Sequence, residues 1–141
     1  MKKKLANRNL RLGLAGEFRV MAELLMRGFN PSLMALDEGV DIILENGIKI
    51  QVKSSTASLR KQLRNRGKDY YSINLMRRGK KTGNLKDSVD FVIVWAYREN
   101  DFFILPANKL RSHSSISLMR ESKSKWYQYL NNWDSLRRGG E

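Results

Sequence analysis

Three polar residues stand at a chemically useful spacing in the segment between Gly39 and Lys53. Asp41 heads one β-branched run, and Gln51 and Lys53 lie two positions apart in the next run. Carboxylate and amide oxygens are ligands that Mg²⁺ accepts in proteins, and a neighbouring ammonium group can orient a water molecule. Hydrolysis of a phosphodiester bond requires these groups, provided that the fold brings them to one place.

Whether Asp41 joins the other two depends on the turn between the runs. Residues Val40–Leu44 and Ile48–Val52 predict two antiparallel strands joined at Glu45-Asn46-Gly47. A two-residue turn would put Asp41 on the opposite face of the hairpin from Gln51 and Lys53. A three-residue turn, with its glycine left-handed in a bulge, pairs Asp41 with Gln51 and puts all three on one face.

The two registers also differ in what they bury. The two-residue turn mixes polar and apolar residues on both faces of the hairpin, whereas the three-residue turn creates one wholly apolar face. That face consists of Ile42, Leu44, Ile48, Ile50 and Val52. We therefore expect the three-residue turn. The alternative is a purely structural one, in which Asp41, Gln51 and Lys53 simply form the solvent-exposed side of an amphipathic hairpin.

A helix is predicted before the hairpin, from Leu12 to Arg27, and Gly28 ends it. Its apolar residues recur at helical spacing, so we expect them to face the core: Leu14, Phe18, Met21, Ala22 and Leu25. Glu17 lies at the rim of this face, from where its carboxylate can reach the hairpin. Glu23 points nearly the opposite way and is expected to be solvated.

Gly16-Glu17 on this helix, Asp41 at the head of the hairpin and Gln51-x-Lys53 on the next strand together resemble the PD-(D/E)XK nuclease superfamily. The resemblance spans roughly residues 13 to 56. It implies a restriction-endonuclease-like α+β fold and an endonuclease that hydrolyses double-stranded DNA with Mg²⁺ or Mn²⁺. Within the superfamily, homing endonucleases and Holliday-junction resolvases suit a small basic chain better than restriction enzymes do.

The resemblance also implies a role for each residue. Asp41, Gln51 and the backbone carbonyl of Val52 would bind the metal ion, Glu17 would hold it directly or through water, and Lys53 would orient the attacking water. Gln51 departs from the superfamily pattern because it replaces an acid. An amide oxygen brings no charge, so such a site would hold its metal more weakly.

Composition points to a polyanionic partner. The 141 residues include 27 Lys plus Arg and 14 Asp plus Glu, which gives a formal charge of +13. Binding to nucleic acid would reduce the repulsion among these positive charges. A ribosome-associated or membrane-surface protein would show the same excess. The absence of cysteine fits the reducing cytoplasm, and no apolar run is long enough to span a membrane. We expect a single domain over residues 1–141.

Two basic segments, at about 54–68 and 76–87, are predicted to be loops that contact DNA. Nine Lys and Arg residues between Arg60 and Lys81 face a single acid, Asp69. The expected DNA contacts are Ser54, Ser55, Arg60, Lys61, Arg64, Arg66, Lys68, Arg77, Arg78, Lys80 and Lys81. One chain holds one site, so cutting both strands predicts a homodimer or a higher homo-oligomer.

The rest of the chain predicts a mixed sheet of about five strands followed by a helix. Aromatic residues on that last helix are expected to pack in the core rather than stack on bases. The expected elements are strands at 70–75, 89–97 and 102–105, a short helical turn at 106–110, an edge strand at 116–119 and a helix at 124–136.

Two other functions remain open on the sequence alone. A DNA-binding module that keeps the nuclease fold, but has lost activity through Gln51, would show the same pattern. An RNA-binding accessory protein would need only the basic segments, and its carboxylates would be incidental.

Overall fold

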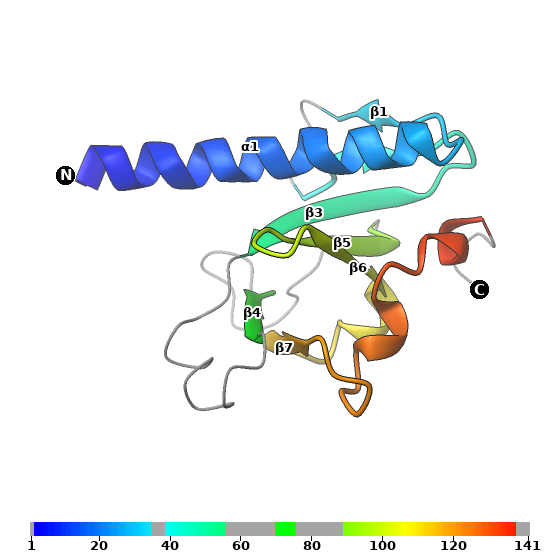
Figure 1. Ribbon diagram of the computed structural model, residues 1–141. Coiled ribbons are helices and arrows are strands. Elements are labelled where there is room, and N and C mark those ends of the chain that lie inside the picture. Colours follow the sequence, from blue (N-terminus) through cyan, green and yellow to red (C-terminus); the bar gives the residue numbers. More distant parts are fainter. Residues whose placement is uncertain (1, 35–38, 56–69, 76–88, 138–141) are drawn as a thin grey trace.

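The computed structural model describes residues 2–34, 39–55, 70–75 and 89–137. Helix α1 lies across one face of a five-stranded sheet, whose order is β1-β2-β3-β5-β6 (Figure 1). Strands β3 and β5 pair in parallel and the other neighbours are antiparallel, which confirms the expected α+β fold with a mixed sheet. The bounds are α1 Lys2–Met26, β1 Ser32–Leu33, β2 Ile42–Ile43, β3 Lys49–Ser55, β5 Phe91–Ala96 and β6 Asp101–Pro106.

A second, two-stranded sheet covers the face of the main sheet opposite α1. It consists of β4 (Tyr70–Asn74) and β7 (Ser115–Met119), which pair antiparallel. Their inward residues pack with Val92, Val94 and Phe103 of the main sheet. The prediction of strands at 70–75 and 116–119 was right, but their place was wrong because they pair with each other. The short strand β1, which the sequence did not reveal, completes the five.

The hairpin adopts the register of the three-residue turn. Ile42 pairs with Ile50, the Leu44 amide donates to the Ile48 carbonyl at 2.9 Å, and Gly47 has a positive φ of 87°. Gly47 is the position where a left-handed residue is needed, and glycine takes that conformation without strain. The apolar side of the hairpin is buried beneath α1, against Val20 and Leu24. Burial thus selects the register, as expected.

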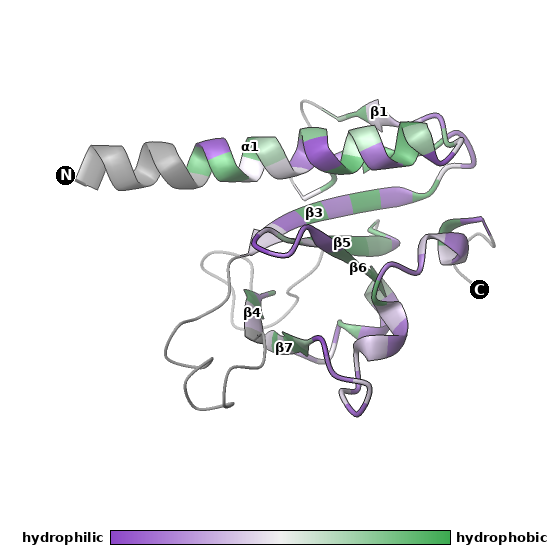
Figure 2. Cartoon of the chain, in the orientation of Figure 1, coloured by the Kyte–Doolittle hydropathy of each residue, from purple (hydrophilic) through white to green (hydrophobic). Residues whose placement is uncertain are grey.

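Helix α1 presents a different face to the sheet from the one predicted. Val20 and Leu24 are fully buried, while Leu14, Phe18 and Leu25 are 51%, 54% and 56% exposed. The reason lies at Gly16: a Cβ atom there would stand 1.9 Å from the Ser54 Oγ atom. The glycine lets the helix backbone approach β3 closely, and this contact sets the rotation of the helix. Figure 2 shows hydrophobic residues along the visible surface of α1.

The ends of α1 are easier to explain. The helix stops as predicted at Gly28, whose φ is +90°, and the Phe29 amide returns to the Leu24 carbonyl at 3.0 Å. It begins at Lys2, ten positions before the predicted start at Leu12. The N-terminal half extends beyond the sheet (Figure 1).

The predicted helix at 124–136 is wrong. Two 3-10 turns, Tyr127–Tyr129 and Trp133–Leu136, replace it, with Asn131 left-handed at φ 52° between them. The Asn131 amide donates to the Phe102 carbonyl at 2.6 Å, and its side-chain oxygen accepts from the Phe102 amide at 3.0 Å. The backbone of Asn131 thus bonds to the edge strand β6, whereas in a helix it would bond within its own segment.

The aromatic residues of this segment pack, as expected, but on two sides of the sheet. Trp126 is 6% exposed and joins the cluster that contains β4 and β7, whereas Trp133 is 3% exposed and joins the cluster beneath α1. The expected helical turn at 106–110 is confirmed as a 3-10 turn at Ala107–Lys109. Within the described part of the chain, no helix is both long and apolar enough to cross a membrane.

Candidate active site

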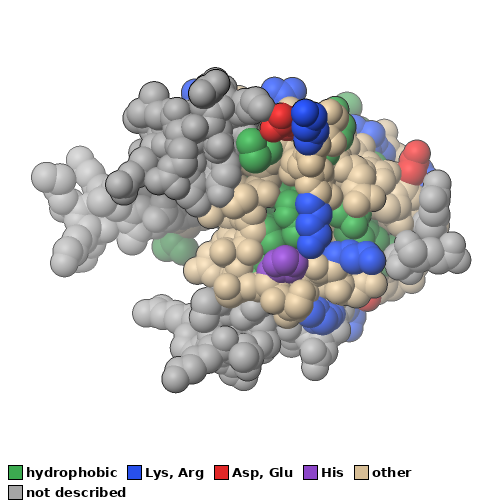
Figure 3. Space-filling view, turned by 90° about the horizontal axis from the view of Figure 1, so that it is seen from below, with side chains coloured by type: hydrophobic (Ala, Val, Ile, Leu, Met, Phe, Trp, Pro, Cys, Tyr) green, Lys and Arg blue, Asp and Glu red, His purple; other side chains and the backbone are tan. Residues whose placement is uncertain are grey.

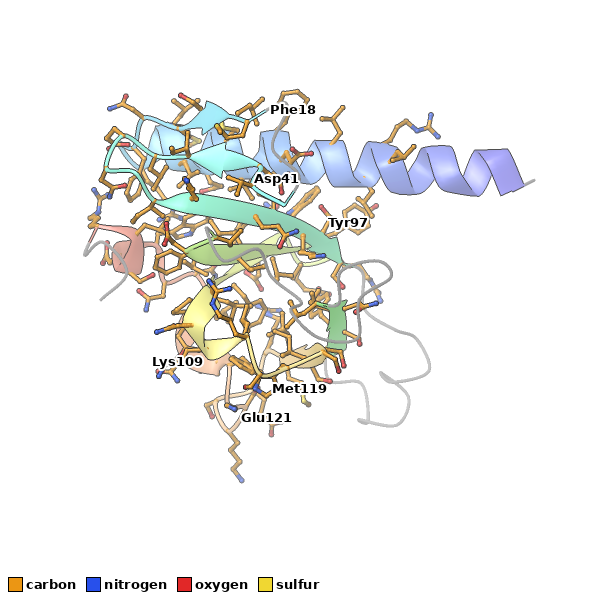
Figure 4. The ribbon with its side chains drawn as sticks, turned by 180° about the vertical axis from the view of Figure 1, so that it is seen from behind. Phe18, Asp41, Tyr97, Lys109, Met119 and Glu121 are labelled. Carbon is orange, nitrogen blue, oxygen red and sulfur yellow. The ribbon has the colours of Figure 1, made fainter. Side chains whose placement is uncertain are left out.

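Asp41 is held at the point where the pairing of β2 with β3 ends. Its amide donates to the Ile50 carbonyl at 2.8 Å, and its Oδ2 atom accepts the Val52 amide at 2.7 Å. Its carbonyl accepts the Met34 amide at 2.9 Å. The side chain therefore replaces a ladder partner of β3, and its carboxylate is fixed between α1 and β3 (Figure 4).

Glu17 reaches this carboxylate from α1, as predicted. The close approach at Gly16 places the helix directly over β3, and the Ser54 hydroxyl donates to the Leu12 carbonyl at 3.2 Å. Partial burial raises the pKa of Glu17, and the Asp41 charge and a hydrogen bond between the two carboxyl groups raise it further. The site therefore joins two acids that disfavour being charged together.

The pKa of Asp41 is also raised, chiefly by burial. The Val52 amide, the Lys53 charge and the hydrogen bond from Glu17 act in the opposite direction. The hydrogen bond between the two carboxyl groups raises the pKa of Glu17 and lowers that of Asp41, so the titration of each group depends on the other.

Lys53 lies on β3, within reach of the Asp41 charge. Burial lowers the pKa of its ammonium group and the Asp41 charge opposes that shift, so the two groups lie within electrostatic reach of each other. Gln51 is two residues away on β3 and shares the face of Lys53 by strand alternation. Register and electrostatics thus bring Asp41 and Lys53 together, with Glu17 leaning in from the helix.

Glu23 stays outside the site, but for a different reason from the one expected. Its side chain is only 16% exposed and is engaged by two arginines, with Arg19 at 2.7 Å and Arg27 at 3.2 Å. These ion pairs lower its pKa in spite of burial. Glu23 is therefore a partner in a structural ion-pair network and not a solvated side chain.

A hydrogen-bonded contact between α1 and the turn that precedes β6 was not predicted from the sequence. The Asn100 Oδ1 atom accepts both the Trp95 indole N–H at 2.9 Å and the Arg19 Nε–H at 3.2 Å. Asn100 is left-handed, with φ 55°, which turns its side chain toward the helix. The Glu99-Asn100-Asp101 turn was visible in the sequence, but nothing in it indicated a contact with a helix some 80 residues earlier.

The predicted DNA contacts divide into two groups. Ser54 donates its hydroxyl hydrogen to the Leu12 carbonyl and Ser55 is 7% exposed, and their contact with DNA stays a prediction. The remaining nine lie outside the described residues: Arg60, Lys61, Arg64, Arg66, Lys68, Arg77, Arg78, Lys80 and Lys81. Elsewhere, Lys and Arg side chains gather beside the histidine on the face opposite α1 (Figure 3).

The donor set around Asp41 is small for a metal site. No group of three or more His, Cys, Asp or Glu side chains that could hold a metal occurs among the described residues. Glu17 and Asp41 still fit a divalent cation, because two half-buried carboxylates in contact repel each other unless a proton or a cation lies between them. The Val52 carbonyl lies on the same edge of β3 as the Val52 amide that binds Asp41.

Comparison with solved structures adds to this geometry. A bacterial homing endonuclease, I-Ssp6803I, matches over 92% of this chain and 93% of its own, with a TM-score of 0.74. The two proteins share one fold. Their sequences are only 20% identical, so the likeness concerns the fold and not the individual residues. The sequence matches no model of a protein family and no curated protein.

Proposed function

We propose that this protein is a divalent-metal-dependent DNA endonuclease of the PD-(D/E)XK type. The observation that carries the proposal is the contact between the Glu17 and Asp41 carboxyl groups beside Lys53, on a fold shared with a homing endonuclease. Each group comes from a different element, so the sheet register and the helix rotation must both be right for them to meet. The basic composition supports a nucleic acid as the substrate.

Mg²⁺ or Mn²⁺ would be held by Asp41, Gln51 and the Val52 carbonyl, with Glu17 as a direct or water-mediated ligand. When bound, such an ion stabilises the negative charge that develops on the phosphate oxygens. Asp41 is already oriented for this role because the Val52 amide fixes one of its carboxylate oxygens.

Lys53 is assigned to the attacking water. Its ammonium group is half-buried beside Asp41, so its side chain is confined near the carboxylate. An ammonium group in this place donates hydrogen bonds to water or phosphate oxygens and offsets part of their negative charge. Its lowered pKa shows that burial already acts on this charge.

Cleavage of plasmid DNA and of a four-way junction, with and without Mg²⁺, tests the proposal. Lys53→Ala should abolish metal-dependent cleavage, whereas Lys49→Ala, four residues earlier on the same strand and about 13 Å away, should leave it intact. Binding of the same DNA, measured for both variants without metal, shows that a loss is catalytic. Cleavage by Lys53→Ala at the parent rate would refute the assignment.

Gln51 decides between this proposal and its nearest rival, a DNA-binding module without activity. The amide supplies an oxygen but no charge, so the site relies on Glu17 and Asp41. If the parent binds DNA but never cleaves it at any Mg²⁺ or Mn²⁺ concentration, the rival holds. Sequencing of the product ends then distinguishes site-specific cutting of homing type from junction-specific cutting.

An RNA-binding accessory role is the second alternative. Equal affinity for RNA and DNA of the same length at one salt concentration, with no effect of Mg²⁺ on cleavage, would favour it. The proposal predicts tighter binding to duplex DNA than to single-stranded RNA.

A further inference from the structure

Beside its buried face, α1 carries an apolar stripe that is exposed in the described part of the chain. Leu14, Phe18 and Leu25 are 51%, 54% and 56% exposed, and Leu10 extends the stripe with 72%. Phe18 lies on the side of the helix away from β3 (Figure 4). These are the residues whose spacing predicted a buried face, yet no described part of the chain covers them.

Their spacing matches the seam of a helix pair. Leu14, Phe18, Met21 and Leu25 are separated by four, three and four positions, as in two heptads of a coiled coil. Met21 is half-buried and packs against the core, so it anchors the stripe to the fold. Two exposed alanines, Ala15 and Ala22, flank the seam and allow another helix to come close.

The area suits a dimer. Each large side chain of the stripe exposes roughly 100 Å², so one chain offers about 400 Å², near the upper range for a monomer. Two copies facing each other would bury about 800 Å² of apolar surface from these residues alone. Stable interfaces bury about 1,200 Å² or more, so residues that flank the stripe on both chains would have to supply the rest.

We infer that the Leu14–Leu25 stripe of α1 is the surface by which two copies of this chain associate, with the two helices antiparallel. The direction follows from charge. Residues 2–11 contain five Lys and Arg and no acid, so a parallel pair would bring two such segments together, whereas an antiparallel pair separates them. It also sets each helix N-terminus against the C-terminal end of its partner.

The stripe is a poor surface for DNA. Between Leu14 and Leu25 the only basic residue is Arg19, which is engaged by Glu23 and Asn100. Contact with phosphates requires available cations, and between Leu14 and Leu25 the described helix offers no basic side chain besides Arg19. Salt separates the two kinds of contact, because screening weakens binding to DNA but favours association of two chains that each carry a charge of +13.

Sedimentation equilibrium of the full chain, without metal or DNA, tests the inference. The parent should be a dimer, more stable at 0.5 M than at 0.1 M NaCl, and Phe18→Glu should weaken association at least about 30-fold. Tyr127→Glu is the matched control, because Tyr127 is 40% exposed and follows Trp126, which packs on the face of the sheet opposite α1. Circular dichroism should show both variants folded, since both side chains are exposed.

Cysteine cross-linking tests the direction of the pair, and the natural chain contains no cysteine to interfere. A mixture of Leu14→Cys and Leu25→Cys chains should form the mixed disulfide in preference to either symmetric one. A monomeric parent at about 100 μM, or a Phe18→Glu variant that dimerises like the parent, overturns the inference. So does loss of DNA affinity in Phe18→Glu when the parent is monomeric. Because no cleavage is measured, the outcome is independent of the proposed nuclease activity.

Discussion

Replacement of Gly16 by alanine measures how closely α1 must approach β3 to bring Glu17 to the site. The new Cβ atom would stand 1.9 Å from the Ser54 Oγ atom, 3.3 Å from its Cβ atom and 3.5 Å from the Trp95 ring. The Ser54 hydroxyl must therefore move and give up its bond to the Leu12 carbonyl. If the hydroxyl cannot find space, the helix must shift and take Glu17 with it.

The expected magnitude combines three effects. Alanine gains about 1 kcal/mol over glycine in a helix interior. Loss of the Ser54 hydrogen bond costs about 1 kcal/mol, and overpacking at a tight contact costs about 1–3 kcal/mol. Gly16→Ala should therefore lower the free energy of unfolding by about 1–3 kcal/mol. In a Ser54→Ala background the clashing atom is gone, so the same change should be neutral or stabilise by up to about 1 kcal/mol.

Urea unfolding of the four chains in this double-mutant cycle gives the answer. The expected coupling is about 2 kcal/mol, because each substitution changes the effect of the other. DNA cleavage measured on the same chains should follow stability, with activity lost in Gly16→Ala and restored in the double variant. If Gly16→Ala has the same effect on unfolding in both backgrounds, the contact with Ser54 does not set the distance between helix and sheet.

Three further predictions follow from the site. Gln51→Glu should lower the Mg²⁺ concentration for half-maximal cleavage about tenfold or more, because it adds a charged ligand; an unchanged metal titration would remove Gln51 from the site. Folding raises the pKa of Glu17, so the folded chain holds that proton more tightly than the unfolded chain and loses stability as the pH rises above the ordinary range of a glutamate. Glu17→Gln should thus unfold at higher urea than the parent at pH ~7, with the difference vanishing near pH ~3; Glu23→Gln, where the pKa is lowered, should show the opposite sign. Mg²⁺ should raise the unfolding temperature of the parent more than that of Asp41→Asn, and equal shifts would mean that the ion binds elsewhere.

The hairpin that carries Asp41 was readable from the sequence because its register is set by local structure. Alternation of apolar residues and the Asn46-Gly47 turn determined the hairpin register, and the register determined that Asp41 meets the strand of Gln51 and Lys53. A shift of one residue would have exposed the whole apolar face, so the physics left a single solution. Glu17 was placed at the rim of the Leu14–Leu25 stripe, and although the sheet buries the neighbouring face of Val20 and Leu24 instead, Glu17 lies between the two faces and still reaches Asp41.

Tertiary structure decided which surfaces meet. Helix α1 has an apolar stripe at Leu14, Phe18 and Leu25 and a narrower ridge at Gly16 and Val20, and periodicity alone favoured the first. The sheet packs against the second ridge, because Gly16 has no Cβ atom. Any larger residue there would place its Cβ atom against the Ser54 Oγ atom.

The same holds for the C-terminal segment, whose aromatic residues are spaced like a helix. The backbone of this segment instead pairs with the open edge of β6, through the hydrogen bonds between Asn131 and Phe102. Local periodicity measures what a segment can bury, but the unpaired hydrogen bonds and the shape of its neighbours determine where it is buried.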